Sequence, residues 1–198
     1  RFGSDQAGVR FNYRLRTSGL ASGTYFLYFQ ANDPVTGAEL WRTQGDAAST
    51  TLIKDINPGP ADGSPAGFTP FNGLMYFSAR TDALGYEPWV TDGTEAGTHL
   101  LMDINPGSAS SNAGGFQVLN GAVYFAAYDG VHGSELWRTD GTAGGTAMVT
   151  DFNPGPGSGV LSTYGHIMSI GGVDTLFFPG DPGGHGNELC RTDGTAGG

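Results

Sequence analysis

The chain has 198 residues, 35 of them glycine and 11 proline, and a net charge of −10. An acidic chain repels phosphate backbones, so nucleic acid is excluded as an expected partner, and no stretch is apolar and long enough to predict a membrane span. The aromatic content of 12% argues against disorder, because disordered chains lack the apolar mass that offsets chain entropy.

Residues 1–17 contain a predicted amphipathic strand. Val9, Phe11, Tyr13 and Leu15 alternate with polar or charged residues, and a period of two gives a strand one apolar face. We expect this strand to complete a sheet, either in the fourth repeat of the same molecule or in a second molecule by strand addition. A third interpretation is that the chain belongs to a longer propeller, since many propellers have more than four blades.

A motif of glutamate, tryptophan and an Asp-Gly-Thr turn recurs along the rest of the chain. Trp41, Trp89 and Trp137 follow one another at intervals of 48 residues, and Cys190 takes the same position 53 residues later. A fixed period of this length is typical of repeat proteins. We expect repeats at residues 18–60, 61–108, 109–156 and 157–198, the last without its fourth strand.

Each repeat predicts four short antiparallel strands. In the third copy the first two strands are joined by Asn120 and Gly121, a strong signal for a two-residue hairpin. The pattern predicts an all-β fold, a propeller-like array of four-stranded blades, with a β-solenoid or tandem small β-domains as alternatives. In this copy the expected strands are residues 116–119, 122–128, 135–139 and 146–152.

The run Glu-Leu-Trp-Arg-Thr-Asp-Gly-Thr at residues 135–142 resembles the bacterial ELWxxDGT repeat family. The Gly-Thr at 145–146 and the Asp-Phe-Asn-Pro-Gly at 151–155 fit the same pattern, and the resemblance covers roughly residues 25–198. It implies large secreted or surface-exposed proteins with propeller-like repeats, and it implies no defined reaction. The first copy departs from the pattern with Gln-Gly-Asp at residues 44–46, and the fourth departs with Cys190.

The tryptophan position predicts a core column between sheets. A tryptophan side chain buries up to about 250 Å², so we expect Trp41, Trp89 and Trp137 to pack between blades, with sugar stacking on an exposed ring as the alternative. Cys190 is the only cysteine, which excludes an intrachain disulfide. We expect it to be a small buried substitute in the column, with a reactive thiol as the alternative.

The Asp-Gly-Thr turns have a structural explanation. Asp92, Asp140 and Asp193 can each accept a hydrogen bond from the amide two residues on, while the following glycine takes a positive φ. Calcium binding is the alternative role for these turns, but one aspartate with carbonyl oxygens supplies too few ligands for that ion. We therefore expect no cofactor and no metal.

Two further columns of carboxylates suggest glycoside hydrolysis, which uses a pair of acids. A catalytic pair is normally a singular feature, whereas these acids recur in nearly every repeat. We therefore expect structural roles and no catalytic residue. The columns are Glu39, Glu87, Glu135 and Glu188, and Asp55, Asp103 and Asp151.

Four loop residues are candidates for ligand binding. Tyr86 and Tyr128 could stack on a glycan, and His132 and His185 each stand in a His-Gly-x-Glu sequence. Two histidines from neighbouring repeats could bind a metal together with a carboxylate, but loop histidines are more often solvated.

Together these features predict a non-enzymatic module at the outside or surface of a bacterial cell. We expect it to act as a scaffold or adhesion surface, with self-association or other surface proteins as partners and filaments formed by strand complementation as one outcome. The alternative is a carbohydrate-binding propeller lectin, and the third reading is a glycan hydrolase or lyase.

Overall fold

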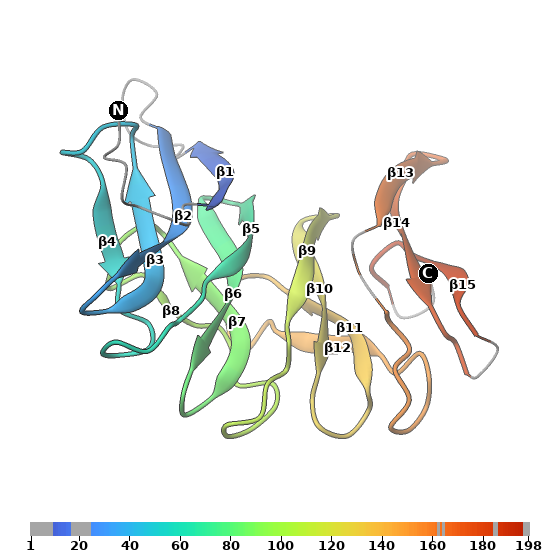
Figure 1. The fold of residues 1–198 in the computed structure, drawn as a ribbon. Helices are drawn as coiled ribbons and strands as arrows, with labels where there is room; N and C mark the ends of the chain where they lie inside the picture. The colour runs from blue at the N-terminus through green and yellow to red at the C-terminus, as the bar shows by residue number, and fades with distance from the viewer. Residues whose placement is uncertain (1–9, 17–24, 162, 164, 184–185, 196–198) are drawn as a thin grey trace. The chain divides into compact units, whose positions relative to one another are not determined.

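The protein is all-β in its described part (Figure 1). The structure, a computed structural model, describes residues 10–16, 25–161, 163, 165–183 and 186–195, and for residues 10–16 it describes the main chain alone. These residues form 15 strands in four antiparallel sheets and contain no helix. The all-β prediction is confirmed, while the propeller arrangement stays a prediction.

In every sheet the strands pair in the order in which they follow one another along the chain. The first sheet contains β1 (Arg10–Arg16), β2 (Tyr25–Asp33), β3 (Gly37–Thr43) and β4 (Thr51–Lys54). The second contains β5 (Ala66–Phe71), β6 (Leu74–Thr81), β7 (Gly85–Thr91) and β8 (His99–Leu100). The third contains β9 (Gly114–Leu119), β10 (Ala122–Tyr128), β11 (Ser134–Thr139) and β12 (Ala147–Thr150). The fourth contains β13 (His166–Ile170), β14 (Val173–Gly180) and β15 (Glu188–Thr192).

The amphipathic N-terminal strand belongs to the first sheet. In β1, Phe11 lies opposite Phe29 of β2 and Arg16 lies opposite Tyr25. The sequence left open a pairing with the fourth repeat or with a second molecule; in the structure the partner is instead the next strand along the chain. Because consecutive strands pair most readily, β1 supplies the first strand that residues 25–54 lack. Val9 and Thr17, the ends of the predicted strand, lie outside the described residues.

The two Asn-Gly hairpins have the backbone that the sequence predicts. Asn72 and Asn120 have φ of 48° and 45°, and the glycine after each has φ of 80°. A two-residue turn with both central residues at positive φ matches the twist of the flanking strands. The turns therefore fix the register of β5 with β6 and of β9 with β10.

The chain forms two compact units. The first unit is Arg1–Ala83 with Trp89–His99, and the second is Leu84–Pro88 with Leu100–Gly198. In the second unit the third and fourth sheets share a core in which Leu136 packs with Leu176 and Phe178, each 0% exposed. Phe152 meets Phe178 edge to face, with 5.5 Å between the ring centroids. Such a contact between two sheet faces is what a repeat needs, since one sheet alone cannot cover both of its faces.

Candidate functional site

The side chains of the tryptophan column are buried or half-buried. Trp89 and Trp137 are each 7% exposed, and Trp41 and Cys190 are half-buried. Burial also raises the pKa of the Cys190 thiol, which makes it a weaker nucleophile at neutral pH. At Trp89 and Trp137, therefore, neither indole offers an open ring face for a sugar.

The Asp-Gly-Thr turns are closed by their own side chains. Asp140 Oδ1 accepts hydrogen bonds from the amide and the hydroxyl of Thr142, at 2.9 and 2.7 Å, and Gly141 has φ of 100°. The hydroxyls of Thr139 and Thr146 lie 2.8 Å apart across the turn. The hydrogen bonds from Thr142 hold the pKa of Asp140 below its ordinary value. Asp92 and Asp193 bind Thr94 and Thr195 in the same way.

The glycine of this turn also docks against the preceding sheet. In the first unit, Arg42 Nη1 donates to the carbonyl of Gly93 at 2.7 Å, and a Cβ on Gly93 would overlap the hydroxyl of Tyr28. In the second unit, the Tyr124 hydroxyl donates to the carbonyl of Gly194 at 3.2 Å. A Cβ on Gly194 would overlap that hydroxyl. The turn is therefore a contact between repeats as well as a link between strands.

A hairpin tip makes the other half of this contact. Asn120, at the turn between β9 and β10, donates from Nδ2 to the carbonyls of Asp174 and Asp193, at 3.0 and 2.9 Å. The third sheet thus holds the fourth at the start of β14 and just after β15. Because the acceptors are main-chain carbonyls, the side chains of Asp174 and Asp193 do not reveal this contact in the sequence.

Three of the four residues of the glutamate column are completely buried, and the fourth, Glu188, is exposed. Glu39, Glu87 and Glu135 are each 0% exposed, and both oxygens of each carboxylate accept main-chain hydrogen bonds. The donors follow at fixed separations of 17 and 24 residues. For Oε2 they are Ile56, Ile104 and Phe152, at 2.9, 3.0 and 2.9 Å. For Oε1 they are Gly63, Ser111 and Gly159, at 2.7, 2.8 and 2.7 Å.

These carboxylates fasten the loop that leads from one sheet toward the next. The loop has no regular ladder, so without Glu39 its amides at residues 56 and 63 would lose their partners in a buried place. Within the same loops, Asp55 Oδ2 accepts from the amide of Gly59 at 3.2 Å, and Asp103 and Asp151 repeat this with Gly107 and Gly155. In the first three repeats each of these acids is therefore hydrogen-bonded to main-chain amides of its own loop.

Burial raises the pKa of all three glutamates. For Glu39 it raises the pKa from 4.5 to about 7, against the opposing hydrogen bonds from Ile56, Asn57 and Gly63, and the Asp55 charge adds to the rise. The pKa values of Glu87 and Glu135 are raised by burial as well.

We expect the protein to lose stability as the pH rises from about 4.5 to 7. In that window the folded state holds protons on its buried glutamates that the unfolded state has released, so the free energy of unfolding falls with pH. Hydrogen bonds from threonine lower the pKa of Asp140 and Asp193, and their stabilisation is lost as the pH falls below about 3.8. Thermal unfolding between pH 3 and 8 should show a maximum near about pH 4–5.

The variant Glu39→Gln provides the control for this profile, because its amide cannot ionise. It should show a shallower fall above the maximum than the wild type. A melting temperature that climbs steadily from about pH 4.5 to 7 in the wild type would contradict the raised pKa values.

The candidate loop residues are placed as follows. Tyr86 and Tyr128 are both hydrogen-bonded to the main chain of Ser111. The Tyr86 carbonyl accepts from the Ser111 amide at 3.0 Å, and the Tyr128 amide donates to the Ser111 carbonyl at 2.8 Å. Tyr128 is 37% exposed and Tyr86 is half-buried. His132 Nδ1 lies 2.7 Å from Asp129 Oδ2, a hydrogen bond that raises the pKa of His132. His185 lies outside the described residues.

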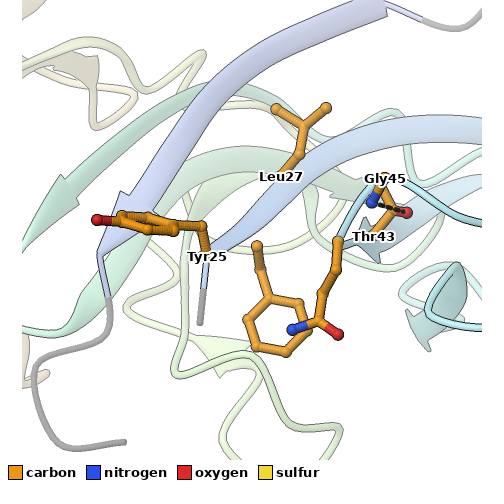
Figure 2. Close-up of a pocket in the computed structure, with 6 residues that line it drawn as sticks. Tyr25, Leu27, Thr43 and Gly45 are labelled. Carbon is orange, nitrogen blue, oxygen red and sulfur yellow. Dashed lines mark hydrogen bonds between the residues drawn. The ribbon is translucent and has the colours of Figure 1, made fainter. Parts of the chain in front are cut away.

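A pocket opens on the first sheet, between the start of β2 and the turn after β3 (Figure 2). Its volume is about 160 Å³, and it lies where the first repeat departs from the Asp-Gly-Thr pattern. The Gly45 amide donates to Thr43 Oγ1 at 3.0 Å along its wall. This first-sheet pocket is lined by Tyr25, Phe26, Leu27, Thr43, Gln44 and Gly45, so the described part of its wall bears no carboxylate, imidazole or thiol.

No cluster of three or more His, Cys, Asp or Glu side chains suited to a metal ion occurs among the residues that the structure describes. Over the same residues, no helix is long and apolar enough to cross a membrane. No protein-family model matches the chain, and no curated protein matches it either.

Proposed function

We propose that the protein is a non-enzymatic repeat module that acts as a scaffold or adhesion surface outside a bacterial cell. Its sheets would stand side by side as the blades of a propeller-like array, each docked on the one before. The resemblance of the repeat to secreted ELWxxDGT proteins supports the location. The partners of this surface would be further copies of the chain or other surface proteins.

The observation that carries this proposal is that the repeated acids are hydrogen-bonded to nearby main-chain and threonine groups. The carboxylates of Glu39, Glu87 and Glu135 are buried and bound to main-chain amides. The turn acid Asp140 is bound to Thr142, and Asp92 and Asp193 repeat that contact. A hydrolase needs an acid that can reach a bound substrate, about 5–10 Å from its catalytic partner. The three buried glutamates and the three turn aspartates are instead hydrogen-bonded within their own loops and turns.

The second candidate function is carbohydrate binding. The partly exposed Tyr128 and the half-buried Tyr86 are hydrogen-bonded to the same residue, Ser111. Tyr128 directly precedes Asp129, the partner of His132. An aromatic ring beside hydrogen-bonding groups can hold a sugar. The loop of the first repeat differs, since it has Thr36 where the third has His132, so any such site would be local and not shared by all repeats.

The proposed function is tested by incubating the protein with a panel of polysaccharides and by probing a glycan array. We expect no new reducing ends and no array signal above that of the Tyr86→Ala, Tyr128→Ala double variant. Array binding that is lost in this double variant would favour the lectin. Turnover that disappears in Glu135→Gln while the variant stays folded would overturn the non-enzymatic assignment.

A further inference from the structure

The contact between the third and fourth sheets defines a repeated docking site. The fourth sheet contributes the start of β14 and the turn after β15, where Asp174, Asp193 and Gly194 accept hydrogen bonds from Asn120 and Tyr124. Leu176 of β14 is buried in the shared core beneath these bonds. The start of β14 and the turn after β15 are thus the part of the fourth sheet that contacts the preceding sheet.

The first-sheet pocket occupies the position on the first sheet that corresponds to the docking site on the fourth sheet. Leu27 pairs with Thr43 across β2 and β3, as Leu176 pairs with Thr192 across β14 and β15. Counting along the strands from these pairs, Tyr25 corresponds to Asp174, and Gln44 corresponds to Asp193. The lining of the pocket therefore coincides with the residues by which the fourth sheet receives the third.

At the turn glycine, no residue that the structure describes occupies this copy of the site. Gly93 is buried and a Cβ there would overlap the Tyr28 hydroxyl, and a Cβ on Gly194 would overlap that of Tyr124. Gly45 takes the same place in the first repeat and is exposed, and no atom of the described residues lies within 4 Å of a Cβ built on it.

The fourth sheet bears the opposite half of the contact on its outer face. Leu189 aligns with Leu136, which the fourth sheet covers completely, yet Leu189 is 77% exposed. Arg191 is also exposed, and its place opposite Phe177 matches that of Arg42 opposite Tyr28. The outer face of the fourth sheet consists of Met168, Ile170, Val173, Phe177, Leu189 and Arg191, of which Met168, Ile170 and Val173 are 58, 46 and 47% exposed.

We propose that a second copy of this chain occupies the first-sheet pocket, laying the outer face of its fourth sheet on the first sheet of its neighbour. Both halves of one interface are present on a single chain, and the halves differ, so the contact is head-to-tail and repeats from copy to copy. Arg191 of one copy donates to the Gly45 carbonyl of the next, as Arg42 does to Gly93 within one chain. This inference rests on the proposed scaffold function and names the surface that performs it.

The test uses two variants that each block one end. Leu189→Arg places a charge on the outer face, and Gln44→Arg places one beside the pocket, where it meets Arg191 of the neighbour. Both side chains are exposed, so folding should be unaffected. Val35→Arg, at a position 73% exposed and outside both surfaces, is the matched control.

Sedimentation velocity over a range of concentrations gives the readout. The wild type and Val35→Arg should grow in mass beyond a dimer, while each blocked variant alone stays monomeric, with a dissociation constant raised at least about tenfold. An equal mixture of the two blocked variants should form a dimer and stop there, because each retains one working end.

Three results would overturn the proposal: a wild type that stays monomeric at all concentrations, association that neither substitution weakens, or a mixture that forms no dimer. Association that survives both substitutions would indicate strand addition at β15 instead. These outcomes are read from mass alone, so they are distinct from a failure of the proposed function, which would appear as turnover or glycan binding.

Discussion

Replacing Glu135 by alanine should lower the free energy of unfolding by about 2–6 kcal/mol, whereas the same change at Glu188 should alter it by less than about 0.5 kcal/mol. Glu135 is 0% exposed and accepts hydrogen bonds from the amides of Phe152 and Gly159. Without the carboxylate these two donors stay buried with no partner, and each costs about 1–3 kcal/mol. Urea unfolding followed by tryptophan fluorescence gives the measurement.

Glu188 is the matched control because it stands at the same place in its repeat but is exposed. Equal losses in the two alanine variants would show that the glutamate matters through the strand and not through its buried amides. Glu135→Gln separates charge from hydrogen bonding. Its amide oxygen can serve one donor, but its NH₂ group faces the other, so this variant should also be destabilised.

Replacing Gly93 by alanine should cost about 1–3 kcal/mol more than replacing Gly45 by alanine. Both glycines lie in the turn after the third strand of a repeat and have similar backbones, with φ of 92° and 109°. The strain of a side chain at positive φ is therefore common to both variants. Only at Gly93 does the new Cβ overlap the Tyr28 hydroxyl of the preceding sheet, so the difference isolates the cost of disturbing the contact between sheets.

Thermal unfolding of the two variants at one pH measures this difference. A third variant, Gly93→Ala with Tyr28→Phe, removes the hydroxyl that the Cβ would meet and should recover part of the loss. Equal destabilisation of Gly93→Ala and Gly45→Ala would mean that the contact between the turn and the preceding sheet does not stabilise the fold. The docking site described for the repeats would then contribute no measurable free energy.

The strands and the tight turns could be predicted because their causes are local. Alternation of side chains marks β10, and Asn120 with Gly121 fixes its hairpin through their own backbone preferences. The hydrogen bond from the Thr142 amide to Asp140 spans two residues, so it too can be predicted from the sequence. What these features share is that each residue and its partner lie within a few positions of one another.

The buried role of the glutamate column could not be predicted, because its partners are main-chain amides. Every non-proline residue has an amide, so nothing in the side chains of Ile56 or Gly63 marks them as donors to Glu39. The available signal was the constant separation of each glutamate from the Asn-Pro-Gly segment that follows. The first-sheet pocket could not be predicted for a similar reason. Gln44 reads only as the loss of the turn aspartate until the strand pairing of the first sheet is compared with that of the fourth.

The strictly sequential pairing of the strands has a kinetic consequence. Each sheet is a meander, and each of the three buried glutamates accepts hydrogen bonds from amides only 17 and 24 residues further on. Proteins dominated by such near-neighbour contacts close short loops and fold quickly for their class. A nascent chain could therefore complete one sheet while the ribosome is still translating the next, and each newly made sheet would find the surface it docks on already formed.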